Sequence, residues 1–547
     1  MNKHTAALLE QHFDTAFNAP DGLKKLRELI LTLAMQGKLV PQDPSDPPAS
    51  ALLKEIEAEK KRLVKEGKMK TPKPLPPVTE EEKPYALPQG WEWVRLGEIT
   101  NVSTGKLDAN AAVDDGEFPF FTCSNKPSAT STYSFDTEAV LLAGNGDFNL
   151  KKYSGKFDAY QRTYVIEPIL LSLDFLFRGI QEIIYAITKN HRGSAIPYLR
   201  LADITHPLFP IPPLPEQHRI VAKIDELMAR CDALEKLRTA QNEKRLSVHA
   251  AAIGQLLNIA EPAQHQRAQA FLAEHFGDLY TVKENVAELR KAILQLAVMG
   301  KLVPQNPNDP PASALLKEIE AEKKRLVKEG KIKTPKLLPP VTQEEKPYAL
   351  PQGWEWVRMG DICWGVTSGA TPQKEFFSEV SGVPFLKVYN IRDQKIDFEY
   401  KKQFVDINYH RSKMGRSTLV PGDVVMNIVG PPLGKVAVIP DDYPEYNCNQ
   451  AIVVFRPVKK ETNRYLYVYL LAGTFLNAIE LVGTAGQDNI SVTKSQMMPI
   501  PFPHMYEQHR IVAKIDELMA LCDSFDQQID AATAKQAELL DAVMAQV

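Results

Sequence analysis

Apolar residues at alternating four- and three-residue steps predict two long helices in this chain. The steps occur twice, 291 residues apart, at Ile220, Ile224, Leu227, Cys231 and Leu234 and again at Ile511, Ile515, Leu518, Cys522 and Phe525. This spacing is the pattern of helices that pack along their length. The first pattern continues to about Leu257. At about 1.5 Å per residue, thirty helical residues would form a spacer of roughly 45 Å.

Shorter amphipathic segments accompany the two long patterns. Residues 22–37, 283–300 and 47–68 place apolar side chains at helical spacing and predict further helices. A proline-rich stretch follows the last of these and predicts an extended lead. The alternation of Trp91 and Trp93 then predicts a first strand whose tryptophans pack into a core.

These elements belong to a frame that occurs twice. A constant shift of 263 aligns residues 38–99 with 301–362, and only seven of the 62 positions differ. A second shared block, 216–232 against 507–523, has one difference in seventeen positions but a shift of 291. The segments 100–215 and 363–506 absorb the 28-residue difference and show little identity. The chain therefore alternates a repeated frame with two different inserts.

The two inserts share one predicted order of elements. Each begins with a polar loop, continues with strands separated by glycine turns, and ends with a helix and a Gly-Ser/Thr-Ala loop at Gly193 or Gly483. A proline-rich segment then ends the extended structure and opens a helix. We therefore expect the same mixed α/β fold in both inserts, with different surface residues.

Composition narrows the class of protein without identifying a ligand. The chain has 547 residues, 44% of them hydrophobic and 24% charged, which suits a soluble globular protein of several folding units. It shows neither a signal peptide nor a run of eighteen apolar residues, so we expect a cytoplasmic protein that spans no membrane. The net charge of −3 indicates no general affinity for nucleic acid. A basic cleft or a partner subunit could still supply phosphate contacts.

Cysteine and histidine patterns exclude the common metal sites. The five cysteines are single, without a Cys-x-x-Cys pair, and His218 and His509 stand alone within repeated segments. Cys231 and Cys522 occupy apolar helical positions, where a core role is expected.

No segment carries the chemistry of a DNA-modifying enzyme. Adenine methyltransferases hold a flipped base in an Asp/Asn/Ser-Pro-Pro-aromatic loop, whereas this chain has Asp-Pro-Pro-Ala at Asp46 and Asp309. Alanine has no stacking face, so we expect turns that begin helices. Residues 430–436 are one residue short of a phosphate-binding loop and have valine in place of the metal-binding hydroxyl. Nuclease and helicase signatures are missing too, so catalysis would belong to partners.

Several motifs together resemble the specificity subunits of type I restriction-modification systems. They are the frame–insert alternation, the Gly-Trp-Glu-Trp-Val-Arg segment, the Ser-Gly-Ala-Thr-Pro segment at 368–372, the loop at 483–491 and the proline-rich exit at 210–220. The resemblance covers essentially the whole chain. The first insert departs from it with Ser-Thr-Gly-Lys at 103–106, and the second exit departs from it with Pro-His-Met-Tyr at 503–506.

The resemblance implies an α+β fold class, with two mixed α/β target recognition domains separated by long antiparallel coiled-coil helices and a pseudo-two-fold internal repeat. The expected segments are an N-terminal helical frame and proline-rich lead at 1–87, target recognition domain 1 at 88–215, a central helical spacer and repeated frame at 216–350, target recognition domain 2 at 351–506, and a C-terminal spacer helix at 507–547.

The resemblance also implies partners. Each recognition domain would read one half of a bipartite site in double-stranded DNA, and the frame would bind two methyltransferase (modification) subunits, with restriction/translocase subunits joining through the complex. The chain itself would be non-catalytic and hold no cofactor, with S-adenosylmethionine, ATP and Mg on partner subunits. The pattern agrees, because a frame repeated about an approximate two-fold can seat two copies of one partner. Half-sites about 34 Å apart also match a rigid spacer.

Polar loop residues of the inserts are the candidate DNA contacts. Arg and Lys read guanine, Asn and Gln read adenine, and basic side chains contact phosphates. The candidates in the first insert are Lys106, Asn145, Tyr160, Gln161, Arg162, Lys189, Asn190, His191 and Arg192. Those in the second insert are Lys374, Lys387, Asn390, Arg392, Asn447, Asn449, Gln450, Gln487 and Asn489.

Two other functions stay open. The chain could be a stand-alone DNA-modifying enzyme with an unrecognised active site, or a coiled-coil scaffold that binds two proteins through its inserts. Divergent inserts beside an almost identical frame favour DNA reading, because a scaffold has less reason to change equivalent loops.

Overall fold

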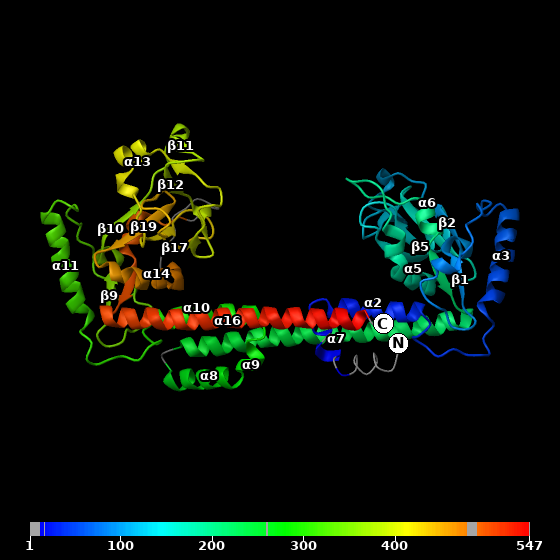
Figure 1. Ribbon diagram of the computed structural model, residues 1–547, viewed down its shortest axis with the longest axis horizontal. Helices are drawn as coiled ribbons and strands as arrows, with labels where there is room; N and C mark the ends of the chain where they lie inside the picture. Colours follow the sequence, from blue (N-terminus) through cyan, green and yellow to red (C-terminus); the bar gives the residue numbers. More distant parts are fainter. Residues whose placement is uncertain (1–10, 12, 16, 259–260, 478–488, 546–547) are drawn as a thin grey trace. The chain divides into compact units, whose positions relative to one another are not determined.

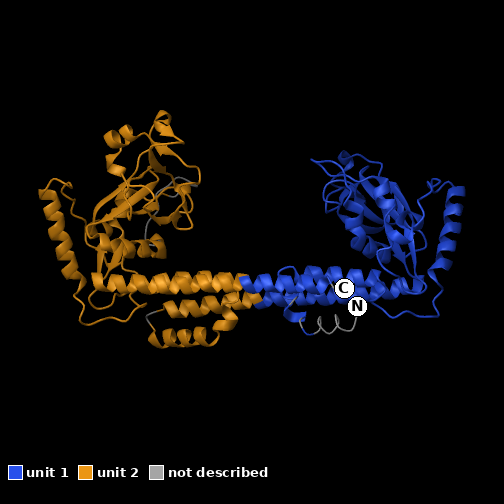
Figure 2. Ribbon diagram, in the orientation of Figure 1, with its two compact units in different colours: residues 1–241, 531–547 blue, residues 242–530 orange. Residues whose placement is uncertain are grey.

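The computed structural model describes residues 11–545 apart from 12, 16, 259–260 and 478–488. The chain forms two compact units, residues 1–241 with 531–547 and residues 242–530 (Figure 2). Each unit contains one insert and one copy of the frame (Figure 1). We refer to them as unit 1 and unit 2.

The predicted frame helices are present in unit 1. They are α2 (Gly22–Met35), α3 (Ala49–Lys65) and the 44-residue α7 (Leu214–Leu257), which continues into unit 2. Arg27 of α2 pairs with Asp232 and Glu235 of α7 at 2.8 and 2.7 Å, whereas Gln42, beyond α2, bonds Glu216 at 2.9 Å. The chain around α2 therefore runs antiparallel to α7.

The heptad positions of α7 pack against that preceding helix. Ile220, Ile224 and Cys231 share a buried core with Ile30 and Ala34 of α2. Spacing correctly predicted a seam of packed helices, but it could not name the partner. The core role expected for Cys231 and Cys522 is confirmed, because both are buried.

Unit 2 repeats this arrangement. Its frame contains α8 (Pro262–Glu274), α9 (Phe276–Leu279), α10 (Lys283–Val298), α11 (Ala312–Lys328) and the start of α16 (Met505–Met544). Arg290 of α10 pairs with Asp523 and Asp526 of α16, each at 2.8 Å, and Gln305 bonds Glu507 at 2.6 Å. The helices α10 and α16 are therefore antiparallel as well.

A pair of short strands joins each insert to its frame. The strand β1 (Glu92–Arg95) pairs antiparallel with β8 (Leu208–Ile211), and β9 (Glu355–Arg358) pairs with β20 (Pro499–Phe502). The predicted first strand is thus shorter than expected, because α4 (Leu96–Ile99) and α12 (Met359–Ile362) follow it. Trp91 is buried in the core, whereas Trp93 is only partly buried, against Tyr85.

The first insert folds around one sheet of order β2-β7-β5-β6-β3-β4. Alternate residues of β5 face opposite sides: Val140 packs toward α5, and Leu141 packs into a second small core with Phe157. The elements are β2 (Thr100–Thr104), β3 (Phe118–Phe121), β4 (Ser128–Thr130), β5 (Phe135–Ala143), β6 (Leu150–Ala159), β7 (Thr163–Pro168), α5 (Leu173–Thr188) and α6 (Leu201–Thr205).

The second insert has the same strand order in its main sheet, β10-β19-β16-β17, and a second sheet of order β11-β15-β12-β18. Parallel pairing of β12 with β18 matches that of β3 with the end of β6. The expectation of one shared α/β fold is therefore confirmed. The strands are β10 (Cys363–Ser368), β11 (Phe377–Ser378), β12 (Val383–Leu386), β13 (Ile391–Arg392), β14 (Lys395–Ile396), β15 (Phe404–Val405), β16 (Val424–Asn427), β17 (Val436–Val438), β18 (Asn447–Cys448) and β19 (Ile452–Pro457).

The helices of the second insert are α13 (Ile407–Lys413), α14 (Asn463–Ala472) and α15 (Val492–Met497). The helical pattern predicted from residue 463 to about 481 is interrupted early. Gly473 adopts a φ of 67° and ends α14, and one 3-10 turn follows over Thr474–Asn477. The rest of that pattern, from residue 478, lies outside the described residues.

The start of α16 contains a buried carboxylate whose titration can be tested. Glu507 accepts hydrogen bonds from Trp354 Nε1 at 2.8 Å and Gln305 Nε2 at 2.6 Å, and burial raises its pKa above the ordinary 4.5. Just above pH 4.5 the folded state holds a proton that the unfolded state has released, so this group stabilises the fold less as pH rises. We expect the free energy of unfolding of Glu507→Gln, relative to wild type, to rise with pH in that window. Urea titrations at several pH values measure this difference, and a pH-independent difference would contradict the assignment.

Candidate nucleic-acid interface

Backbone hydrogen bonds gather four loops of the first insert at one edge of its sheet. Gln161 donates its N–H to Leu107 O at 2.9 Å, and Gly144 donates to Arg162 O at 2.8 Å. Gly146 donates to Pro197 O at 3.0 Å. The loops around residues 106, 145, 161 and 192–198 therefore meet and bring candidates separated by up to 86 positions to one surface region. Lys189 and Asn190 instead line a pocket with Glu82, Trp93 and Arg95.

Four of the candidate residues of the first insert are exposed cations. Lys106, Arg162, Lys189 and Arg192 are exposed, and no carboxylate of the described residues lies within ion-pair distance of them. Asn145 and Tyr160 are partly buried, and the His191 ring lies 5.9 Å from the Phe148 ring. Gln161, Asn190 and His191 are exposed. Among the described residues, this edge has three cations without a carboxylate partner, Lys106, Arg162 and Arg192, and has the chemistry expected for phosphates and base edges.

The second insert forms a matching edge. Ala370 donates its N–H to Cys448 O at 3.1 Å, Ile428 donates to Ala451 O at 2.8 Å, and Ile490 donates to Ile428 O at 2.9 Å. These bonds bring together the loops that contain the candidates Asn449, Gln450 and Asn489. The Gln450 side chain also bonds Thr371, a residue that loop composition did not single out.

Two glycines show that the central turns of the two edges are equivalent. A Cβ atom at Gly105 would lie 2.0 Å from Ala159 O, and one at Gly369 would lie 1.9 Å from Cys448 O. Each glycine lets the loop after the first sheet strand touch the turn before β7 or β19. The turns 160–162 and 449–451 therefore occupy the same place in their domains, with Tyr-Gln-Arg in one and Asn-Gln-Ala in the other.

The structure places other candidates away from this edge or inside the domain. Asn390 is 1% exposed and donates to Asp397 O and Tyr400 O at 3.1 and 2.9 Å. Asn447 is fully buried and bonds His410 Nδ1 and Met414 O at 3.0 and 3.1 Å. Both side chains donate hydrogen bonds to main-chain carbonyls inside the domain, so neither is included in the proposed interface. As DNA contacts they stay untested predictions.

The structure describes three of the four remaining candidates of the second insert, Lys374, Lys387 and Arg392. Lys374 is exposed on a 3-10 turn over Lys374–Phe376, and Arg392 is exposed on the hairpin formed by β13 and β14. Lys387 is partly buried and follows Leu386, whose carbonyl accepts the Asn449 N–H at 3.1 Å. Gln487 lies outside the described residues. Tyr389, Tyr400 and Lys401 were not among the candidates, although each lies within two residues of a lysine in the sequence.

Within the described ranges, His, Cys, Asp and Glu side chains form no group of three or more placed to hold a metal ion. None of the helices described is both long and apolar enough to cross a membrane.

Known proteins resemble this chain over nearly its whole length. A family model described as "Type I restriction modification DNA specificity domain" matches residues 88–243 and 351–533. The specificity subunit of the Escherichia coli type I restriction enzyme EcoAI is 35% identical, over 95% of this chain and 93% of that protein. The E. coli EcoEI specificity subunit is 33% identical over the same shares.

A solved structure, the HsdS subunit from Thermoanaerobacter tengcongensis, aligns with 19% identity over 85% of this chain and 99% of that one, at a TM-score of 0.40. The two matched regions of the family model together exceed half of the chain and contain the candidate residues of both inserts. The chain therefore belongs to the family of type I restriction enzyme specificity subunits, which recognise DNA sequence.

Proposed function

We propose that this chain reads a bipartite site in double-stranded DNA, with one insert contacting each half of the site. The observation that carries the proposal is the pair of equivalent turns, 160–162 and 449–451. They keep one backbone arrangement and one glutamine but differ in their neighbours, Tyr160 and Arg162 against Asn449 and Ala451. Such a change alters base preference while the fold stays the same, because base edges are distinguished by individual side chains.

The proposal includes two methyltransferase subunits seated on the repeated frame. Helices α3 and α11 have identical sequences over seventeen residues, yet only three residues of each are buried. Core packing therefore does not explain the identity of their exposed residues. Two identical exposed surfaces on one chain suit two copies of one partner.

In this proposal the chain is not itself catalytic. Asp46 pairs with Arg219 at 2.6 Å, and Asp309 pairs with Arg510 at 2.6 Å, so both Asp-Pro-Pro-Ala segments tie the start of a frame helix to a long helix. S-adenosylmethionine, ATP and Mg would be bound by partner subunits, with restriction/translocase subunits joining the complex. This argument favours a recognition subunit over a stand-alone enzyme.

Exchange of one insert tests the proposal. Replacing residues 351–506 with the corresponding insert of a relative should change one half of the methylated sequence and leave the other half unchanged. Genome-wide mapping of N6-methyladenine in cells that carry the wild-type or chimeric chain, with the methyltransferase subunits, measures both halves at once. The reciprocal exchange of residues 88–215 is the matched control and should change only the other half.

Three outcomes would contradict the proposal. A chimera that changes both halves, or neither half, would show that the inserts do not read separate half-sites. Adenine methylation by the purified chain alone would support the stand-alone enzyme. Partner complexes whose activities are independent of DNA sequence would support the scaffold.

A further inference from the structure

The second insert carries cations and tyrosines that pack together beside its recognition edge. Lys401 Nζ lies 5.4 Å from the ring centroids of both Tyr389 and Tyr400, and Lys387 Nζ lies 5.9 Å from that of Tyr389. The Arg392 guanidinium lies 4.3 Å from the Tyr400 ring, and the two tyrosine rings meet edge to face at 6.0 Å. We call these five residues the tyrosine–cation cluster.

Buried polar groups hold the cluster in place. Asn390 accepts the Lys387 N–H at 2.8 Å and donates to Tyr400 O at 2.9 Å, which joins the two ends of the segment. The hairpin between them turns at Asp393 and Gln394, both with positive φ. The Gln394 side chain accepts the Val436 N–H at 2.8 Å and so anchors the hairpin to β17. These hydrogen bonds therefore fix the position of the cluster in the domain.

Two lysines of the cluster differ from their basic neighbours in their ion pairs. In the part of the chain that the structure describes, neither Lys387 nor Lys401 has a carboxylate within ion-pair distance. Arg392, by contrast, pairs with Asp397 at 3.3 Å, and the neighbouring Lys402 pairs with Glu399 at 2.7 Å. An aromatic face positions an ammonium group by attraction to its ring without cancelling the positive charge. The cluster therefore presents a positive field that is available to an anion.

The cluster is continuous with the recognition edge of its domain. Leu386, the residue before Lys387, accepts the N–H of Asn449 in the central turn at 3.1 Å. Val436, which anchors the hairpin, follows the loop that starts at Ile428 on the same edge. An anion bound by the cluster would thus lie next to whatever the turn 449–451 contacts.

The first insert has no room for an equivalent segment. Only residues 122–127 connect β3 with β4, whereas residues 387–403 connect the corresponding strands β12 and β15. The shorter connection contains one lysine, Lys126, and no tyrosine. The cluster is therefore a property of the second insert.

We propose that the tyrosine–cation cluster binds the phosphate backbone beside the half-site read by the second insert, independently of base sequence. The inference rests on the proposed function. Each lysine that neutralises a phosphate of B-form DNA releases counterion and contributes about 0.9 to the slope of log K against log salt.

Measuring DNA affinity at several salt concentrations tests the proposed phosphate contacts. The full-length chain, assembled with its methyltransferase subunits, is titrated with a labelled duplex that contains the mapped site, at several NaCl concentrations. We expect Lys387→Ala and Lys401→Ala each to reduce the slope by about 0.9 and to weaken binding about fivefold at 0.15 M salt. The double variant should lose about 1.8 in slope and roughly thirtyfold in affinity.

Lys402→Ala is the matched control, because Lys402 lies in the same loop but pairs with Glu399 at 2.7 Å. Its salt slope should equal that of wild type. Losses in Lys387→Ala and Lys401→Ala should be the same on the cognate duplex and on one whose second half-site is scrambled, since phosphate contacts are independent of sequence.

The outcomes separate this inference from the function on which it depends. Wild-type binding that is sequence-specific, combined with unchanged slopes in the double variant, would overturn the proposed phosphate contacts and leave the proposed function intact. Losses confined to the cognate duplex would also overturn it, because the lysines would then read bases. A wild-type complex without sequence preference would overturn the proposed function itself.

Discussion

Replacing Arg358 with alanine should lower the free energy of unfolding of unit 2 by about 3 kcal/mol, because one carboxylate and three carbonyl groups lose their buried cationic partner. Arg358 is 2% exposed and lies at the end of β9. It makes two bonds to Glu345, at 2.6 and 2.7 Å. It also donates to the carbonyls of Pro339, Pro340 and Met497, at 2.9, 2.9 and 2.7 Å.

Those partners explain why the expected loss is large. Pro339, Pro340 and Glu345 belong to the proline-rich lead, and Met497 precedes the strand that leaves the insert. One guanidinium therefore joins the lead, the incoming strand and the exit. Lysine offers a single ammonium group and cannot reproduce these bonds, so Arg358→Lys should recover little stability.

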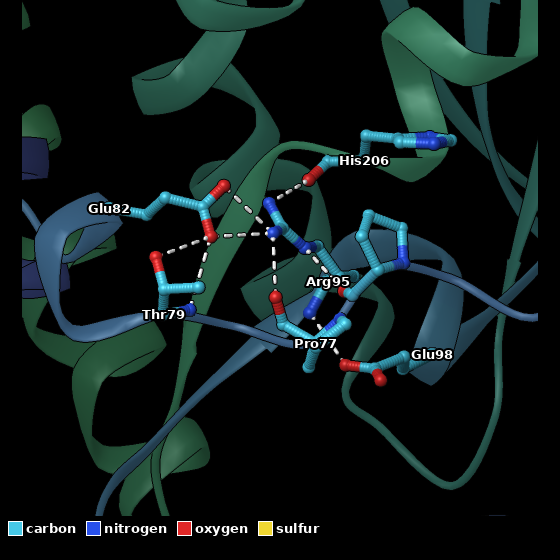
Figure 3. A network of polar contacts seen from close by, with 7 residues as sticks. Pro77, Thr79, Glu82, Arg95, Glu98 and His206 are labelled. Atoms are coloured by element: carbon cyan, nitrogen blue, oxygen red, sulfur yellow. Dashed lines mark hydrogen bonds and ion pairs between the residues drawn. The ribbon is translucent and has the colours of Figure 1, made fainter.

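Unit 1 supplies an internal comparison. Arg95 bonds Glu82, Pro76 O, Pro77 O and His206 O in the same way (Figure 3). Arg95→Ala should therefore destabilise unit 1 by a similar amount, as measured by urea titration with a probe in each unit. If the free energy of unfolding fell by less than about 0.5 kcal/mol in either variant, the arginine would contribute no more than an ordinary surface residue.

The pH dependence of the Arg358 pair has a defined sign. Arg358 lowers the pKa of Glu345 from 4.5 to about 2, chiefly through its hydrogen bonds. The stabilisation from this pair is therefore present above pH 4.5 and is lost as pH falls toward about 2. That acid-sensitive component should be missing from the unfolding profile of Arg358→Ala.

Substituting Gly369 with alanine should impair recognition of one half-site. The new Cβ atom would lie 1.9 Å from Cys448 O and 2.6 Å from Asn449 O, so the turn 449–451 or the loop 369–371 must move. Backbone cannot yield as a flexible side chain can, and overpacking of this kind costs about 1 to 3 kcal/mol of stability. Displacing one residue to which the proposed function assigns base reading should also weaken cognate binding by roughly tenfold or more.

A matched pair of variants isolates the effect of Gly369→Ala. A Cβ atom at Gly415 in the same unit meets no atom within 4 Å, so Gly415→Ala should bind and methylate as wild type does. Gly105→Ala, whose Cβ atom would lie 2.0 Å from Ala159 O, should impair the other half-site. Binding to duplexes with either half-site scrambled assigns each loss. Equal losses at both half-sites in either variant would contradict separate reading by the two inserts.

The loop edges of the two inserts show which candidate residues can be predicted from loop composition alone. Loop composition selected Tyr160, Gln161 and Arg162, and the structure brings them beside Lys106 and Arg192. The same reasoning selected Asn390 and Asn447, which are buried and hold backbone. A polar residue in a loop has the same letter whether it faces solvent or supports a turn, and only its neighbours in space separate the two roles.

The repeat, the main frame helices and the order of elements along each insert were predicted from the sequence alone, because identity between copies and the 3.6-residue and two-residue periodicities are local properties of the chain. Other features required the folded chain. Spatial neighbours decide that β1 pairs with β8 and β9 with β20, and that the apolar positions of α7 pack on α2. They also decide that Lys387 and Lys401 lie against tyrosine rings. Most of these partners lie more than a hundred positions apart in the chain. A periodic pattern shows which face of an element is apolar, but the residue that covers that face is decided only when distant segments pack together.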